Sequence, residues 1–154
     1  LFYNPNYAQR IWLRCRAKSG IIMSEDHLER IETLARIGSS LAGVQFEAAA
    51  LDPTQLTGDK WAFGYCFGLL DAMAQYANLD QYSEGVKLMS NALGKIMCDE
   101  MRGLEIFTQG VDLQSDPQFV EGLSAGAQDL TAWAEDANAL PTQLARHINS
   151  GVRH

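Results

Sequence analysis

Hydrophobic residues recur at helical spacing through most of the chain. Between residues 24 and 50 they stand three, four and seven positions apart, which is the period of one face of an α-helix. Ser24 is a suitable N-cap, and acidic residues follow it in the first turn, where the helix dipole favours negative charge. The pattern therefore predicts a helix over residues 24–50.

The same period continues towards the C-terminus, interrupted by short polar segments. These segments contain residues that favour a helix start, such as Asp59, Asp80 and Asp116. Further helices are predicted at residues 59–78, 80–108, 116–138 and 139–151, with Gly85, Gly94 and Gly103 as candidate bend points in the longest of them. The sequence thus predicts an all-α, single-domain bundle of about five helices, in which residues 23–154 form the helical domain.

One apolar segment contains two glycines that a helix does not favour. The stretch WAFGYCFGLLDAMAQ, residues 61–75, places Gly64 and Gly68 four positions apart and is apolar nearly all round, which predicts the most buried helix. Each glycine inside a helix costs about 1 kcal/mol relative to alanine. We therefore expect the pair to permit the close approach of a second helix backbone.

A similar pattern recurs 58 residues later in the chain. Five positions match under this shift: Trp61, Gly64, Gly68, Asp71 and Ala74 align with Phe119, Gly122, Gly126, Asp129 and Ala132. The shared pattern has two interpretations, a duplicated helical hairpin or a chance agreement. In the first, the glycine seam of Gly64, Gly68, Gly122 and Gly126 forms a Gly-x3-Gly helix crossing.

An aspartate follows each glycine pair by one helical turn. If the two stripes faced each other, Asp71 and Asp129 would converge and would need a shared proton or a cation. In the alternative interpretation, each carboxylate is hydrogen-bonded separately and stabilises the structure. The candidate polar site consists of these two residues with the neighbouring polar and aromatic side chains: Asp71, Gln75, Tyr76, Asp129 and Trp133.

Other signatures of chemistry are missing from the sequence. The three histidines show no metal-ligand spacing, and no phosphate-binding or nucleophile motif occurs, so we expect no metal and no cofactor. Cys15, Cys66 and Cys98 are widely spaced, which predicts no disulfide framework and a reducing, cytoplasmic environment. No apolar run reaches the roughly 18 residues of a transmembrane segment.

Charge is distributed unevenly along the chain. Residues 1–22 carry four basic residues and no acidic one, so the remaining 132 residues carry −11 of the net charge of −7. An acidic body disfavours nucleic acid as a partner. The basic segment has three interpretations: an arm that docks on an acidic surface, a targeting element, or an extension upstream of a translation start at Met23.

These observations favour a small non-catalytic helical protein that works through a protein–protein interface or self-association. The candidate interface lies in the N-terminal arm, whose aromatic and basic residues are of the types enriched at interface hot spots. They are Phe2, Tyr3, Tyr7, Arg10, Trp12 and Arg14. Exchange of the arm between two copies would give a homodimer. The alternative is a ligand-binding or enzymatic bundle with a pocket near Asp71 and Asp129.

Overall fold

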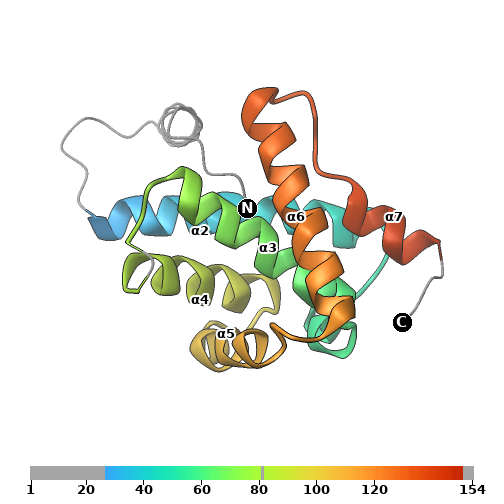
Figure 1. Ribbon diagram of the computed structural model, residues 1–154, viewed down its shortest axis with the longest axis horizontal. Helices are drawn as coiled ribbons and strands as arrows, with labels where there is room; N and C mark the ends of the chain where they lie inside the picture. The colour runs from blue at the N-terminus through green and yellow to red at the C-terminus, as the bar shows by residue number, and fades with distance from the viewer. Residues whose placement is uncertain (1–26, 81, 151–154) are drawn as a thin grey trace.

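The computed structural model describes residues 27–80 and 82–150, and each regular element in these two ranges is helical (Figure 1). The α-helices are α2 (His27–Ala48), α3 (Lys60–Tyr76), α4 (Glu84–Ile96), α5 (Gly103–Asp112), α6 (Pro117–Glu135) and α7 (Gln143–Asn149). Two 3₁₀ helices, η1 (Pro53–Gly58) and η2 (Glu100–Arg102), precede α3 and α5. The predicted all-α, single-domain fold is confirmed. None of these helices is long and apolar enough to span a membrane.

Aspartate side chains cap the N-termini of two long helices, α3 and α6. Asp59 Oδ1 accepts a hydrogen bond from the backbone N–H of Ala62 at 3.0 Å, at the start of α3. Asp116 Oδ1 accepts from the N–H groups of Gln118 and Phe119 at 2.9 and 3.3 Å, at the start of α6. Each bond satisfies a donor that the helix itself leaves unpaired. The two helix starts predicted at these residues are confirmed.

The helix predicted over residues 80–108, with Gly94 and Gly103 among its candidate bend points, is broken into α4 and α5, and the chain reverses direction between them. Cys98 adopts a left-handed conformation with φ of +57°, and the N–H of Asp99 donates to the carbonyl of Gly94 at 2.9 Å. This bond pattern ends a helix. A Cβ on Gly103 would lie 2.2 Å from the carbonyl oxygen of Ser90, so glycine there lets α5 pack back against α4.

Helix α3 lies at the centre of the molecule. It contacts α6 on one side and α4 on another (Figure 1), and the contact with α6 is the most extensive between helices of the described chain. Every residue from 61 to 70 is buried, as the sequence predicts. Between residues 61 and 76, solvent reaches Asp71 and Gln75 to an intermediate degree. At these two positions, solvent can therefore reach one side of the central helix.

The glycine seam lies where the backbones of α3 and α6 come closest. A Cβ on Gly64 would lie 2.1 Å from the carbonyl oxygen of Phe119, and a Cβ on Gly122 would lie 2.0 Å from that of Trp61. Both distances are far shorter than a van der Waals contact. The helices can approach this closely only because these positions have no side chain.

The second pair of glycines repeats this geometry one turn further along both helices. A Cβ on Gly68 would lie 2.0 Å from the Leu123 carbonyl oxygen, and a Cβ on Gly126 would lie 2.0 Å from that of Tyr65. Leu123 follows Tyr65 by 58 positions, the same shift that relates the glycines. The contacts are therefore reciprocal between two parallel helices. A duplicated hairpin as their origin stays a prediction.

Candidate functional site

The residues of the candidate polar site lie in two different environments. Asp71 and Gln75 lie on α3 and line a groove on the surface, whereas Asp129 lies on α6 and contacts the start of α7. Within residues 27–80 and 82–150 the two carboxylates share no hydrogen-bond partner. The structure thus places the two aspartates in separate networks and not in one pair.

The other two residues of the candidate polar site belong to the contact between α3 and α6. The Tyr76 hydroxyl lies 2.6 Å from Thr131 Oγ1, which also donates to the Ala127 carbonyl at 2.8 Å. Trp133 is 1% exposed and lies in the core. Neither side chain lines the groove beside Asp71.

Asp129 holds the N-terminus of α7. Its Oδ2 accepts hydrogen bonds from the backbone N–H groups of Thr142 and Gln143, at 3.1 and 3.0 Å. The same oxygen accepts from the Tyr65 hydroxyl at 2.6 Å, and Oδ1 accepts from the Gln143 side chain at 2.9 Å. Burial raises the pKa of Tyr65 far above its usual value, so its hydroxyl remains a donor. The arrangement is typical of a structural carboxylate.

Gln45 completes this network from α2. Its Oε1 accepts from the N–H groups of Leu144 and Ala145 at 3.0 and 3.3 Å, and its Nε2 donates to the Tyr65 hydroxyl at 3.0 Å. Four successive backbone donors at the start of α7 are thus satisfied by side chains from two other helices. The sequence reasoning missed Gln45, because its partners are about 100 positions away.

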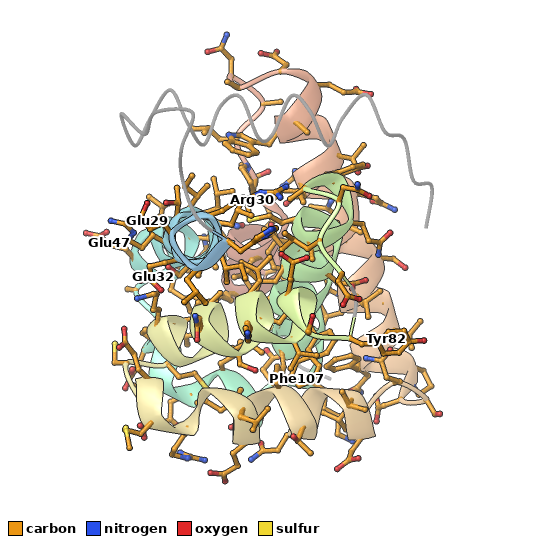
Figure 2. All side chains as sticks on the ribbon, turned by 90° about the vertical axis from the view of Figure 1, so that its left-hand side faces the viewer. Glu29, Arg30, Glu32, Glu47, Tyr82 and Phe107 are labelled. Atoms are coloured by element: carbon orange, nitrogen blue, oxygen red, sulfur yellow. The ribbon has the colours of Figure 1, made fainter. Side chains whose placement is uncertain are left out.

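The α3–α5 groove is the cavity into which Asp71 opens. It has a volume of about 820 Å³ and runs between α3, α4 and α5. Its lining includes one carboxylate, three amides, three aromatic side chains and aliphatic residues, among them Asp71, Gln75, Phe67, Tyr82, Phe107 and Val111. Figure 2 shows Phe107 between α4 and α5, and Tyr82 beyond the end of α4. Sequence reasoning missed the third wall of this groove, because it did not predict that α5 folds back.

The three aromatic residues of the groove differ in their packing and in their exposure to solvent. The rings of Phe67 and Phe107 stack with centroids 5.5 Å apart and planes 15° apart. Phe67 is buried, Phe107 is half-buried and Tyr82 is 87% exposed. The groove therefore has a floor of two stacked aromatic rings and a solvent-exposed aromatic residue at its rim.

The Asp71 carboxylate lies in an unfavourable position for a charge. Burial raises its pKa above the ordinary 3.8, and this effect is opposed by the hydrogen bond from Gln75 Nε2 to Oδ2 at 2.8 Å. Within the part of the chain that the structure describes, Gln75 provides the only hydrogen bond to this carboxylate. A cation placed beside it would offset the loss of hydration.

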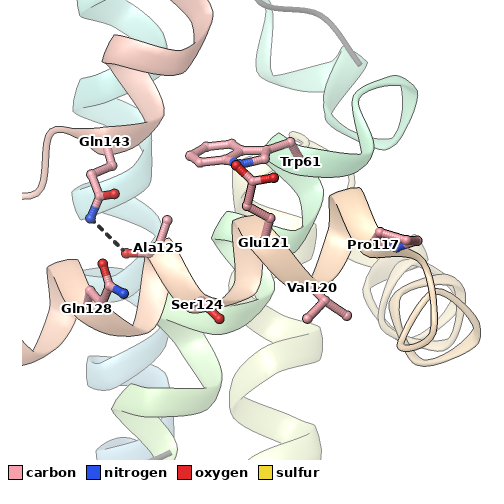
Figure 3. Close-up of a pocket in the computed structure, with 8 residues that line it drawn as sticks. All are labelled: Trp61, Pro117, Val120, Glu121, Ser124, Ala125, Gln128 and Gln143. Atoms are coloured by element: carbon pink, nitrogen blue, oxygen red, sulfur yellow. Dashed lines mark hydrogen bonds between the residues drawn. The ribbon is translucent and has the colours of Figure 1, made fainter.

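A second, more open cavity of about 500 Å³, the α6 groove, runs along the outer side of α6 (Figure 3). Gln143 lies at one end of it and Pro117 at the other, with Trp61 between them, and Gln143 Nε2 donates to the Ala125 carbonyl at 3.3 Å. The carboxylate that lines it belongs to Glu121, an exposed residue. An exposed carboxylate keeps its hydration and gains little from a bound partner, so the α3–α5 groove is the stronger candidate.

Two further predictions concern metals and cysteines. In residues 27–80 and 82–150, no group of three or more His, Cys, Asp or Glu side chains is placed to hold a metal ion. Cys66 is buried and Cys98 is exposed, and both are free thiols. Burial raises the pKa of Cys66 far above its usual value, so it is a neutral core residue.

The candidate interface in the N-terminal arm lies outside the described residues. It consists of Phe2, Tyr3, Tyr7, Arg10, Trp12 and Arg14. No protein-family model, curated protein or solved structure matched this chain when each was searched. Function must therefore be inferred from the geometry of the site.

Proposed function

We propose that this chain is a binding protein whose α3–α5 groove takes an organic cation with an apolar body. The observation that carries the proposal is the half-buried Asp71 carboxylate, which opens into a groove lined by aromatic, aliphatic and amide side chains. The volume of about 820 Å³ falls within the range of small-molecule sites, roughly 300–1,000 Å³. A ligand of this kind would contact both the carboxylate and the apolar walls.

The aromatic lining supports the same ligand class. A cation is attracted to the face of an aromatic ring by about 0.5–2 kcal/mol, depending on how far the pair is removed from water. Phe107 and Tyr82 both lie in the groove with part of their surface accessible. A neutral apolar ligand would also remove water from the Asp71 carboxylate, but it would offer this charge no partner in place of the water. An anion would be repelled by the same carboxylate.

The direct test compares two ligands that differ chiefly in charge, 3-phenylpropylammonium and 3-phenylpropanol. We expect the cation to bind more tightly, and we expect Asp71→Asn to weaken its binding by about tenfold, since hydrogen bonds to charged groups contribute about 1.5–3 kcal/mol. Binding is measured by calorimetry or by NMR titration of the full chain. The matched control is Asp112→Asn, the same change at an exposed position on α5, which should leave the affinity unchanged. Equal affinity for the two ligands would contradict the proposal.

The affinity for the cation should also depend on pH. Because burial raises the pKa of Asp71 above 3.8, this residue takes up a proton at a higher pH than an ordinary aspartate. Protonation removes the negative charge, so affinity falls as the pH is lowered through the raised pKa. Conversely, the bound cation lowers the pKa, and binding releases protons in this range. Calorimetry in buffers of different ionisation enthalpy measures this release, which should vanish in Asp71→Asn.

A further inference from the structure

We infer that the α3–α5 groove is occupied by residues 1–22 of the same chain. The inference rests on the groove being the binding site proposed above, and it names the partner. The segment RIWLR, residues 10–14, carries two guanidinium groups on either side of three apolar side chains. It therefore has the chemistry of the proposed ligand class, a cation on an apolar body.

The side chains of this segment suit the lining of the groove. A guanidinium group such as that of Arg10 or Arg14 can pair with a carboxylate through two hydrogen bonds and can stack on an aromatic ring. Asp71 offers the carboxylate, and Phe107 and Tyr82 offer the rings. The indole of Trp12 adds a large apolar surface of the type that anchors interfaces.

The chain enters the described fold beside this groove. Nδ1 of His27, the first residue of α2, lies 2.8 Å from Oε2 of Glu84, the first residue of α4. The next two residues of α4, Gly85 and Val86, line the groove. The entry point and the groove therefore lie at the same end of α4.

The length of the connecting chain is sufficient to reach the groove. Thirteen peptide units separate Arg14 from His27, and this length of extended chain spans up to about 45 Å. A domain of this size has a radius of gyration of only about 14 Å. The segment can therefore reach the groove without any change in the helical domain.

Charge and tethering favour the chain's own arm over that of a second copy. Residues 1–22 carry +4 and the remaining 132 residues carry −11, so the two parts attract each other at low salt. A short flexible tether gives an effective concentration in the millimolar range. The arm of a second copy, present at a lower concentration, would compete poorly for the groove. The predicted homodimer, in which two copies exchange arms, is an alternative outcome of the test below.

Disulfide trapping with the native Cys15 tests the inference in the full chain. Cys98 is exposed and is first changed by Cys98→Ser, which leaves Cys15 and the buried Cys66. A second cysteine is then introduced by Val111→Cys at the groove or, as the matched control, by Val120→Cys on α6. The two valines are similarly exposed, at 46% and 42%, and Val120 lines the α6 groove instead.

With oxidised glutathione as the two-electron oxidant, we expect the disulfide from Cys15 to form about tenfold faster with Val111→Cys than with Val120→Cys, because the docked arm raises the local concentration. The product should be a monomer on non-reducing electrophoresis, and peptide mapping identifies the linked residues. Either the additional change Asp71→Asn or 0.5 M salt should reduce the difference in rate between the two positions, because both weaken the attraction between the arm and the groove.

Three results would overturn the inference. Equal rates at the two positions would show that the arm has no preference for the groove. A disulfide-linked dimer as the main product would assign the groove to the arm of a second copy. A rate difference that Asp71→Asn leaves unchanged would remove the carboxylate from the recognition. Because the arm and 3-phenylpropylammonium would compete for one groove, a saturating concentration of this ligand should slow the selective trapping. Selective trapping that the ligand leaves unchanged would reject the small-ligand function and retain the arm as occupant.

Discussion

Gly68→Ala is expected to destabilise the protein by about 2 kcal/mol, although alanine is the better helix former by about 1 kcal/mol. The added Cβ would lie 2.0 Å from the carbonyl oxygen of Leu123 and 2.7 Å from the carbonyl carbon of that residue. These are backbone atoms, so no side chain can rotate away and α3 must separate from α6. Gly68→Leu should destabilise by more, about 3 kcal/mol or beyond. Urea denaturation with an unchanged m-value measures both effects.

A glycine elsewhere in the chain provides the matched control. Gly43 lies within α2, and a Cβ built on it would meet nothing within 4 Å. Gly43→Ala should therefore stabilise the protein by up to about 1 kcal/mol through helix propensity alone. If Gly68→Ala stabilised to the same extent, the backbones of α3 and α6 would not be in the close contact described.

Because the contacts of the glycine seam are reciprocal, a glycine on α6 provides a second test of the same prediction. Gly126→Ala should destabilise about as much as Gly68→Ala, because its Cβ would lie 2.0 Å from the Tyr65 carbonyl oxygen. The two changes together should destabilise by less than their sum. Once one methyl group has forced the helices apart, the second meets a wider gap, and neighbouring sites that share a backbone shift are not additive.

Local signals in the sequence predicted most of the helices but not the reversal of the chain between α4 and α5. The helical period and the capping aspartates are properties of a few neighbouring residues, and the starts of α3 and α6 followed from them. Gly94 and Gly103 indicated a bend in this part of the chain, but the reversal itself lies at Cys98, where a non-glycine residue with φ of +57° is held by the surrounding structure. Without this reversal, α5 could not be placed beside α4.

The sequence named both aspartates of the candidate site but did not distinguish their roles, because these roles depend on tertiary contacts. Asp71 and Asp129 occupy equivalent positions in the repeated pattern, so the sequence treated them alike. Their neighbours differ, because α7 brings its backbone N–H groups to Asp129 whereas Asp71 remains beside an open groove. Similar local sequence therefore gave one structural carboxylate and one candidate binding carboxylate, and only the tertiary fold distinguishes them.

The second large effect is expected for Asp129→Ala, which should destabilise the protein by about 3 kcal/mol. The change removes the acceptor for the Tyr65 hydroxyl and for the N–H groups of Thr142 and Gln143. Tyr65 is fully buried, so its hydroxyl cannot turn to solvent, and an unsatisfied buried donor carries the full loss of hydration. The start of α7 would then be held by Gln45 alone.

Two measurements distinguish this loss of capping from a general effect of removing an acid. Asp112→Ala, at an exposed site on α5, is the matched control and should change stability by no more than about 0.5 kcal/mol. Hydrogen exchange should show that the amides of Thr142 and Gln143, which donate to Asp129, lose protection in Asp129→Ala, whereas amides at the centre of α3 retain theirs relative to the global stability. Unchanged protection of α7 would mean that packing of Leu144, which is fully buried, holds this helix in place without the carboxylate.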